Sequence, residues 1–306
     1  MTLSHALFAV LVFPGLVFAV PMSWLMLGLE RKLRARMQGR IGPPLWQPFF
    51  DLVKLLGKSP VARAASDRAI LVGLPVLALG SAIGVLALLP VGSGESAFTG
   101  DLILLVARLE MPPLCLVLAG YASRSIYGEV GATREAIVGI VSNVAFLVAL
   151  VAMATAAQSL HLSRIALATS WPVRASALAA ILLCLPAKLR LNPFSLANAE
   201  QEILAGPLTE FDGRRLALWE LAHGLEWVAL AGVVTTLAMP VRTGIAIVDA
   251  LGFALASLVV VAAFTLLAAA TARLKLAQAT RLLLRWPTLA AGVALTLALV
   301  GRYGGH

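Results

Sequence analysis

Eight apolar stretches, each about as long as a bilayer is thick, dominate this sequence. They cover residues 5–29, 69–90, 102–121, 135–157, 171–187, 216–239, 244–271 and 282–300. A helix needs about 20 apolar residues to cross roughly 30 Å of hydrocarbon. Backbone groups in lipid must be hydrogen-bonded within the segment, and the runs lack the short alternation typical of barrel strands. We therefore expect an all-α integral membrane protein of about eight transmembrane helices, forming a single membrane domain over residues 1–306.

The composition excludes an ordinary soluble chain, because 60% of the residues are hydrophobic and only 13% are charged. The first apolar stretch has neither a basic segment before it nor a small-residue cleavage site after it. A secretory signal peptide would carry both. We therefore expect this stretch to be a retained membrane helix.

The net charge of +9 is distributed as a topology signal. With eight spans, 19 of the 24 Lys and Arg residues fall on one side and four on the other, and Arg108 lies within the third span. Basic loops stay in the cytoplasm. We therefore expect a multi-pass protein of the bacterial inner membrane with both termini in the periplasm, and no nucleic-acid partner.

Ligands for a redox centre are missing from the sequence. Its two cysteines, Cys115 and Cys184, lie in separate apolar runs, and the four histidines are scattered. Disulfide, zinc and iron–sulfur sites require paired or clustered ligands. No nucleophile–base pair stands out either. We expect a non-catalytic chain without a cofactor or metal of its own.

The segment after the first span combines a dense basic run with a Gly-Pro turn and an amphipathic helix. From Trp46 to Lys58 the apolar residues fall on one helical face and the polar residues on the other, which predicts a helix lying in the membrane interface. Two interpretations remain open: a simple surface anchor, or the wall of a docking surface or lipid-substrate entrance. With Arg134 from a later loop, the docking or cavity candidates are Glu30, Arg31, Arg34, Arg36, Arg40, Gly42, Pro43, Asp51 and Lys54.

Ionisable residues near or inside apolar segments form the second candidate set. Such groups are costly in a membrane and often serve proton transfer or partner contacts. The alternative is helix capping and snorkelling at span ends, and Thr133 fits helix-start chemistry. The proton-relay candidates are Glu110, Glu129, Glu135, Glu200, Glu202, Glu210, Asp212, Glu220, His223 and Glu226.

Four segments in order resemble the membrane "subunit 1" family shared by respiratory complex I and group 4 membrane-bound NiFe hydrogenases. They are Glu30-Arg-Lys32 with Arg40-Ile-Gly-Pro43, Asp51-Leu-Val-Lys-Leu-Leu-Gly-Lys58, Gly131-Ala-Thr-Arg-Glu135, and Ala199-Glu-Gln-Glu202 with Ala205-Gly-Pro-Leu-Thr-Glu-Phe-Asp-Gly213. The details resemble the hydrogenase branch more closely, in particular the formate hydrogenlyase membrane subunit.

The resemblance implies a membrane anchor and coupling subunit of an oxidoreductase complex. The resemblance also implies two kinds of partner. Hydrogenase-like large and small (Fe-S) subunits would form a peripheral arm, and antiporter-like membrane subunits would lie beside this chain in the lipid bilayer. Fe-S clusters, with NiFe or quinone, would belong to those partners. It also implies buried carboxylates that link electron transfer to proton translocation.

This chain departs from the family pattern at positions where the family has acids. Asn143, Ser195 and Asn198 replace three of them, and the acid expected early in the sixth span falls on His223. An asparagine hydrogen-bonds but does not take up a proton near neutral pH. Either the relay is rerouted through Glu110, Glu129, Glu135 and His223, or the subunit is mainly an anchor.

Two rival functions of different class remain. One is the quinone-chamber subunit of an NADH:quinone oxidoreductase, with its cavity behind the amphipathic helix. The other is a stand-alone proton or ion transporter, although the sequence has no inverted repeat or broken-helix pair.

Overall fold

The computed structural model describes residue 8 and residues 10–59, 68–90, 102–239 and 245–303, and every named element among them is a helix. The side chains of residues 68, 69, 200, 201 and 246 lie outside this description. The α-helices are α2 (Leu16–Met37), α3 (Gln47–Leu56), α4 (Arg68–Leu88), α5 (Leu102–Ala122), α6 (Ile126–Ala157), α7 (Leu162–Ala168), α8 (Trp171–Lys188), α9 (Glu200–Ile203), α10 (Gly213–Ala238), α11 (Ala246–Ala270) and α12 (Leu276–Tyr303). A short 3₁₀ turn, η1, covers Gly206–Leu208.

Seven helices in the described part are long and apolar enough to cross a membrane: α4, α5, α6, α8, α10, α11 and α12. The eighth expected span, residues 5–29, begins among residues that the structure does not describe. Its described part, α2, continues through the charged residues that follow and ends at Met37. Leu, Arg, Lys, Ala and Met favour a helix, so the helix does not stop where the apolar run stops. The all-helical membrane fold is confirmed.

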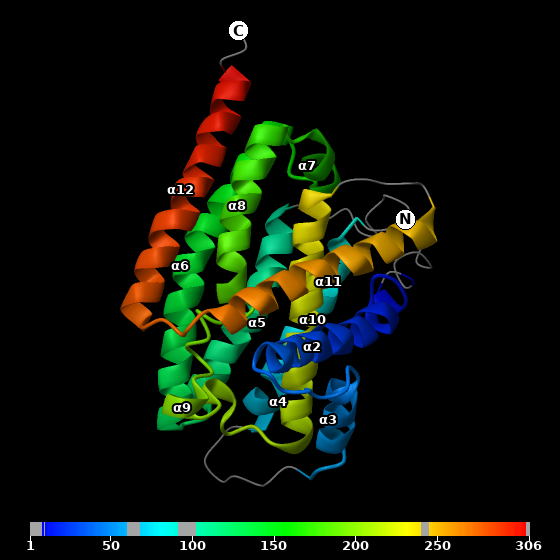
Figure 1. Cartoon of the computed structure of the whole chain (residues 1–306), viewed down its shortest axis with the longest axis vertical. Helices are drawn as coiled ribbons and strands as arrows, with labels where there is room; N and C mark the ends of the chain where they lie inside the picture. Colours follow the sequence, from blue (N-terminus) through cyan, green and yellow to red (C-terminus); the bar gives the residue numbers. More distant parts are fainter. Residues whose placement is uncertain (1–7, 9, 60–67, 91–101, 240–244, 304–306) are drawn as a thin grey trace.

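The helices form a bundle around α10, which packs against α2, α3, α4, α5, α8 and α11. Within the apolar window of α10, 83% of the residues are buried, compared with 28% in α11 and α12. Figure 1 shows α2 and α11 side by side and strongly inclined to α6, α8, α10 and α12, and the two are in contact. Helix α12 closes the other side of the bundle against α6 and α8.

The fourth expected span, residues 135–157, forms the later part of a longer helix, because α6 begins at Ile126. Thr133 therefore lies inside the helix, where its hydroxyl donates to the carbonyl oxygen of Glu129 one turn earlier. The Gly-rich segment before it continues the helix beyond the apolar run. Helix-start chemistry at Thr133 is wrong, since hydropathy marks only the part of a helix that lies in lipid.

The amphipathic helix is present as α3, directly after a turn that lies against α2. The apolar side chains Trp46, Phe50 and Val53 remain about half exposed, at 47%, 57% and 51%. The turn approaches α2 at Gly28, where an added Cβ would lie 1.9 Å from the carbonyl oxygen of Leu45. Only a residue without a side chain allows this approach.

Candidate functional site

A partly buried polar triangle joins α5, α6 and the end of α8, with 26% of the Glu110 side chain exposed. Lys188 donates from Nζ to Glu110 Oε1 and to Asn143 Oδ1, both at 2.6 Å. Asn143 Nδ2 donates to Glu110 Oε2, also at 2.6 Å. The ammonium group of Lys188 also lies 4.5 Å from the centre of the Phe146 ring. The Lys188 side chain is only 7% exposed, so its positive charge is neutralised by Glu110 inside the bundle.

A second buried group centres on Arg190, two residues beyond the end of α8. Its Nε donates to Glu135 Oε1 at 2.9 Å and its Nη2 to Glu226 Oε2 at 2.8 Å. Its Nη1 lies 2.9 Å from His223 Nδ1. The side chains of Arg190 and the two glutamates are at most 10% exposed. One guanidinium thus holds α6 and α10 together, because its three nitrogens present donors in a rigid, planar arrangement that a single ammonium group does not reproduce.

His223 Nδ1 lies near two possible hydrogen-bond partners, one of which is a donor and the other an acceptor. It lies 2.9 Å from Arg190 Nη1, which can only donate, and 3.4 Å from Glu226 Oε2, which accepts when ionised. A neutral imidazole whose Nδ1 carries no proton accepts from Arg190. A protonated one donates to Glu226 and loses the bond from Arg190. The geometry thus allows two mutually exclusive hydrogen-bonding states.

A small cavity links the two groups. Glu110, Asn143 and Lys188 from the first and Glu135 and Glu226 from the second line a space of about 20 Å³. A cavity of roughly 10–15 Å³ on this measure holds one water molecule when polar groups line it. A single water would therefore fit between the two sets of carboxylates.

A second cavity, of about 60 Å³, lies on the other side of the Arg190 group. Glu220, His223 and Glu226 line it, together with two buried polar groups, Asn198 Oδ1 and Trp219 Nε1, that have no hydrogen-bond partner among the described residues. Buried polar groups are almost always hydrogen-bonded to protein or ordered water. We infer that water fills this space.

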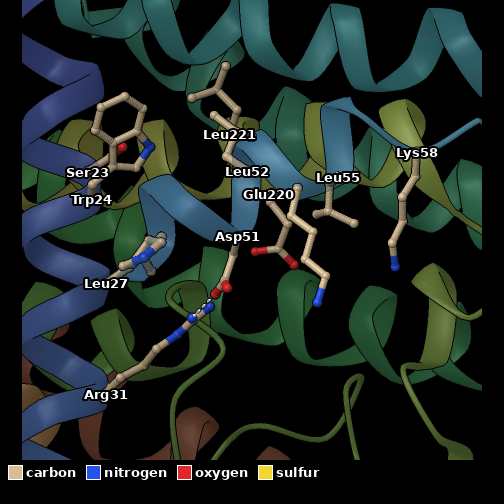
Figure 2. A pocket seen from close by; sticks show the side chains of 12 residues that line it. Ser23, Trp24, Leu27, Arg31, Asp51, Leu52, Leu55, Lys58, Glu220 and Leu221 are labelled. Carbon is tan, nitrogen blue, oxygen red and sulfur yellow. Dashed lines mark hydrogen bonds and ion pairs between the residues drawn. The ribbon is translucent and has the colours of Figure 1, made fainter. Parts of the chain in front are cut away.

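A larger cavity, of about 280 Å³, opens between α2, α3 and α10. Figure 2 shows the Asp51 carboxylate directed toward Arg31, with Glu220 beside Asp51 and with Trp24 and Leu27 on the α2 side of the cavity. Glu220 lines this cavity and also the 60 Å³ cavity beside His223. Polar groups therefore continue from the outer cavity through Glu220 to the Arg190 group.

One ion pair lies on the wall of this cavity, and a second lies within α2. Arg31 Nη1 lies 2.6 Å from Asp51 Oδ2 and joins α2 to α3, and Gln47 also donates to Asp51. Partial burial raises the pKa of Asp51, but the hydrogen bonds from Gln47 and Arg31 outweigh it, so that this pKa lies below its ordinary value. Glu30, which is buried, pairs with Arg34 one turn along α2.

A further ion pair lies at the surface, outside the buried groups. Arg134 Nη1 is 2.6 Å from Glu202 Oε2, which links α6 to α9. The hydrogen bond and the charge of Arg134 hold the pKa of Glu202 below its ordinary value. The Glu202 side chain is 54% exposed, so this pair does not belong to the chain of buried groups.

The structure brings five of the predicted relay residues into or beside the buried groups: Glu110, Glu135, Glu220, His223 and Glu226. Glu129 lies exposed in the first turn of α6. Glu210 and Asp212 are half-buried before or at the start of α10, and the Glu200 side chain lies outside the described residues. Glu202 is placed at the surface.

Among the predicted docking residues, those of the first loop lie around the end of α2 and on α3. Arg36 and Arg40 are exposed, and Arg40 donates to Gln38. Gly42 has φ of +78°, and an added Cβ there would lie 2.9 Å from the Cβ of Ala35. Pro43 next to it is half-buried, and Lys54 lines the 280 Å³ cavity.

Lys188 and Arg190 were not among the predicted site residues, although both occur where an apolar run ends. Their charges contribute to the topology signal, and residues 188–215 as a segment were expected to help dock the peripheral arm. A signal was present: acids predicted inside a membrane require cationic partners, and these two are the basic residues that follow the fifth span. Asn143, noted as a departure from the family pattern, completes the first group.

The described residues hold no group of three or more His, Cys, Asp or Glu arranged to bind a metal. Arg108 likewise forms no ion pair with an acidic side chain among the residues that the structure describes. The Arg108 side chain is exposed, and it lies close to Gly84 of α4.

Comparison with known proteins identifies relatives over most of the chain. Residues 8–299 match the family described as NADH dehydrogenase. Hydrogenase-4 component C of Escherichia coli (strain K12) is 33% identical over 231 residues, which cover 73% of each chain. Formate hydrogenlyase subunit 4 of the same organism is 32% identical over 62% of this chain and 64% of its own length.

An NADH-quinone oxidoreductase subunit of Geobacillus kaustophilus (strain HTA426) is 32% identical over 73% of this chain and 72% of its own. Among solved structures, a chain of the membrane-bound sulfane sulfur reductase, an archaeal respiratory membrane complex, superposes with a TM-score of 0.84. That match covers 96% of this chain and 98% of the other at 24% identity, which shows a shared fold.

Proposed function

Because the chain belongs to the NADH dehydrogenase family, we propose that it is the membrane-anchor and coupling subunit of a hydrogenase-like, complex I-related redox complex. Its relatives are membrane subunits of complex I-like and hydrogenase complexes. In this assignment the chain docks a peripheral arm with hydrogenase-like large and small Fe-S subunits and contacts antiporter-like membrane subunits. Fe-S clusters, NiFe or quinone belong to those partners. The assembly lies in a bacterial inner membrane, with both termini periplasmic.

The buried chain of ionisable groups is the observation that carries the coupling part of the proposal. Glu220, His223, Glu226, Glu135 and Glu110 are linked through Arg190, Lys188 and two small polar cavities. Ionisable groups inside a membrane are costly, are usually paired with one another, and often mark a proton pathway. Here Glu110, Glu135 and Glu226 are each paired with a cation. Water-sized spaces beside these pairs suit stepwise proton transfer.

His223 takes up and releases the proton in this relay, which Asn143, Ser195 and Asn198 cannot do in place of the family's acids. Histidine is the side chain whose ordinary pKa lies near neutral pH. When a proton arrives at Nδ1, the bond from Arg190 is lost and a bond to Glu226 forms. A proton entering beside Glu220 would therefore change the partners of Arg190, and with them the ion pair to Glu135.

Proton uptake by the whole complex, reconstituted in vesicles, tests this relay. We expect Glu110→Gln, Glu226→Gln and His223→Gln each to lower coupled proton uptake at least tenfold while the peripheral subunits remain bound. Glu129→Gln is the matched control, because that carboxylate is exposed at the start of α6 and lies outside the chain of groups. Normal coupled proton uptake in all three variants would contradict the relay and would leave the subunit with the role of an anchor.

Docking is supported by the exposed charges of Arg36 and Arg40 near the end of α2. Figure 1 shows α3 and α9 near the lower end of the bundle. Arg34 pairs with Glu30 within α2, whereas Arg36 and Arg40 are exposed and form no ion pair among the described residues, so we expect them to meet an acidic partner surface. We expect Arg36→Glu with Arg40→Glu to release the peripheral subunits at moderate salt. The control is Arg164→Glu with Arg302→Glu, since both residues are exposed and belong to α7 and the far end of α12. Equal retention by the two double variants would remove this docking surface.

A second candidate function is favoured by the 280 Å³ cavity between α2, α3 and α10. Its lining combines apolar Trp24, Leu27 and Leu55 with Asp51 and Glu220 (Figure 2), a mixture that suits an amphipathic head group such as a quinone. Quinone-dependent turnover that Leu55→Trp abolishes would establish this function. Hydrogen- or formate-linked turnover that is unaffected by Leu55→Trp and by quinone-site inhibitors would exclude it.

A further inference from the structure

A cavity of about 660 Å³ lies apart from the buried charged groups, where α6, the segment after α8 and the α11–α12 turn meet. Its lining residues are Arg134, Asn192, Leu196, Glu202, Arg273, Leu274, Lys275 and Leu276. A backbone bond from Leu274 N to the carbonyl oxygen of Pro193, at 3.1 Å, holds the turn against the segment after α8. The cavity therefore has a defined wall made from distant parts of the chain.

Positive charge predominates in this cavity. Glu202 neutralises Arg134, but no ion pair is formed by Arg273 or Lys275 within the described residues. Arg273 is half-buried and its Nε lies 3.4 Å from Ser195 Oγ, whereas Lys275 is exposed. Two cations are thus available for an anion, and arginine with lysine is the usual donor set for phosphate.

The cavity lies at the level where spans leave the hydrocarbon. Arg134 precedes the apolar part of α6, and Lys275 directly precedes α12, which is a candidate membrane span. Apolar Leu196, Leu274 and Leu276 lie next to the cations.

We propose that this cavity binds the phosphate group of an anionic phospholipid from the leaflet on the side of the basic segments. Arg273 and Lys275 contact the phosphate, and the leucines lie against the first carbons of the acyl chains. A free phosphate would use the cations but not the leucines. An acidic peptide would not need a site at the ends of spans.

The test uses the full-length chain in dodecyl maltoside, titrated with 1-palmitoyl-2-oleoyl phosphatidylglycerol and followed by native mass spectrometry. We expect Arg273→Gln with Lys275→Gln to weaken binding roughly thirtyfold, because each of the two cations near a lipid surface contributes about 1 kcal/mol. The matched control, Arg281→Gln with Arg285→Gln, removes the same charge from exposed positions of α12 outside the cavity. It should change the affinity less than about twofold.

A variant that is expected to bind the lipid more tightly distinguishes a specific loss of binding from a general loss of folding. Glu202→Gln removes the carboxylate from the cavity and frees Arg134, so phosphatidylglycerol should bind about threefold more tightly. Equal loss in the two double variants, equal binding of phosphatidylcholine, or displacement of the lipid by about 10 mM inorganic phosphate, well below the physiological ionic strength of about 0.15 M, would each overturn the proposal. So would unchanged lipid binding in Arg273→Gln with Lys275→Gln.

Discussion

Lys188 Nζ lies 2.6 Å from Glu110 Oε1, although the two residues are 78 positions apart in the chain. This contact joins the end of α8 to the middle of α5 inside a bundle whose other contacts are mostly apolar. The pair is therefore both a structural link between two spans and a member of the chain of buried ionisable groups.

Lys188→Met should destabilise the protein, because Glu110 would then remain buried with only the amide of Asn143 as its partner. We expect a loss of about 3 kcal/mol in the free energy of unfolding, measured in mixed micelles by circular dichroism. Adding Glu110→Gln should restore most of this loss, since a neutral pair needs no cation. Lys275→Met, at an exposed position, should have an effect below about 0.5 kcal/mol. Wild-type stability in Lys188→Met would contradict the observed pairing.

Arg190→Lys tests whether the geometry of the guanidinium matters or only its charge. One ammonium group does not reach Glu135, Glu226 and His223 at the positions that three guanidinium nitrogens occupy. We expect the lysine variant to lose about 2 kcal/mol and Arg190→Met about 4 kcal/mol in the same unfolding assay, because the latter leaves two buried carboxylates without a cation. Equal stability of the lysine variant and the wild type would show that charge alone suffices.

Gly28→Ala should displace the turn that leads into α3, because its Cβ would lie 1.9 Å from the carbonyl oxygen of Leu45. We expect a destabilisation of about 2 kcal/mol, comparable to that of an overpacked core. Gly252→Ala in α11 is the control, since nothing lies within 4 Å of its added Cβ. There alanine should stabilise the helix by up to about 1 kcal/mol. Two variants with the same melting temperature would argue against the close approach at Gly28.

The link between α2 and α3 through Arg31 and Asp51 should depend on pH. The folded state lowers the pKa of Asp51, so its stabilising effect is complete above the ordinary value of about 3.9 and is lost as the pH falls through the lower folded-state value. We expect Asp51→Asn to speed hydrogen exchange in α3 at pH 6.5. The difference from the wild type should be smaller near pH 3, because stability from this group begins to fall once the pH is below the ordinary value. A constant difference at both pH values would exclude ionised Asp51 as its source.

The positions of the spans could be predicted because hydropathy reports directly on contact with lipid. The amphipathic pattern after Trp46 likewise predicted α3, whose polar residues Asp51 and Lys54 line the 280 Å³ cavity. Helix ends were less predictable. Helix α6 starts nine residues before its apolar run, and α2 continues eight residues beyond its own, because helical hydrogen bonds continue into the charged flanks.

The candidate site could be predicted only by residue type. Glu110, Glu135 and Glu226 stood out as acids in apolar surroundings, but Glu129 stood out for the same reason and lies exposed. Lys188 and Arg190 looked like topology charges. Nothing local distinguishes a basic residue that faces water from one that turns back into the bundle.

The sequence by itself determined that this chain crosses a membrane repeatedly, which end of the bundle is basic, and which families it resembles. Those properties follow from the transfer of single segments between water and lipid. Only the tertiary structure decided which acid meets which base, because these contacts join residues 33 to 78 positions apart on four different elements. A buried charge is stable only with its partner in place, and the packing of the helices around α10 determines where that partner lies.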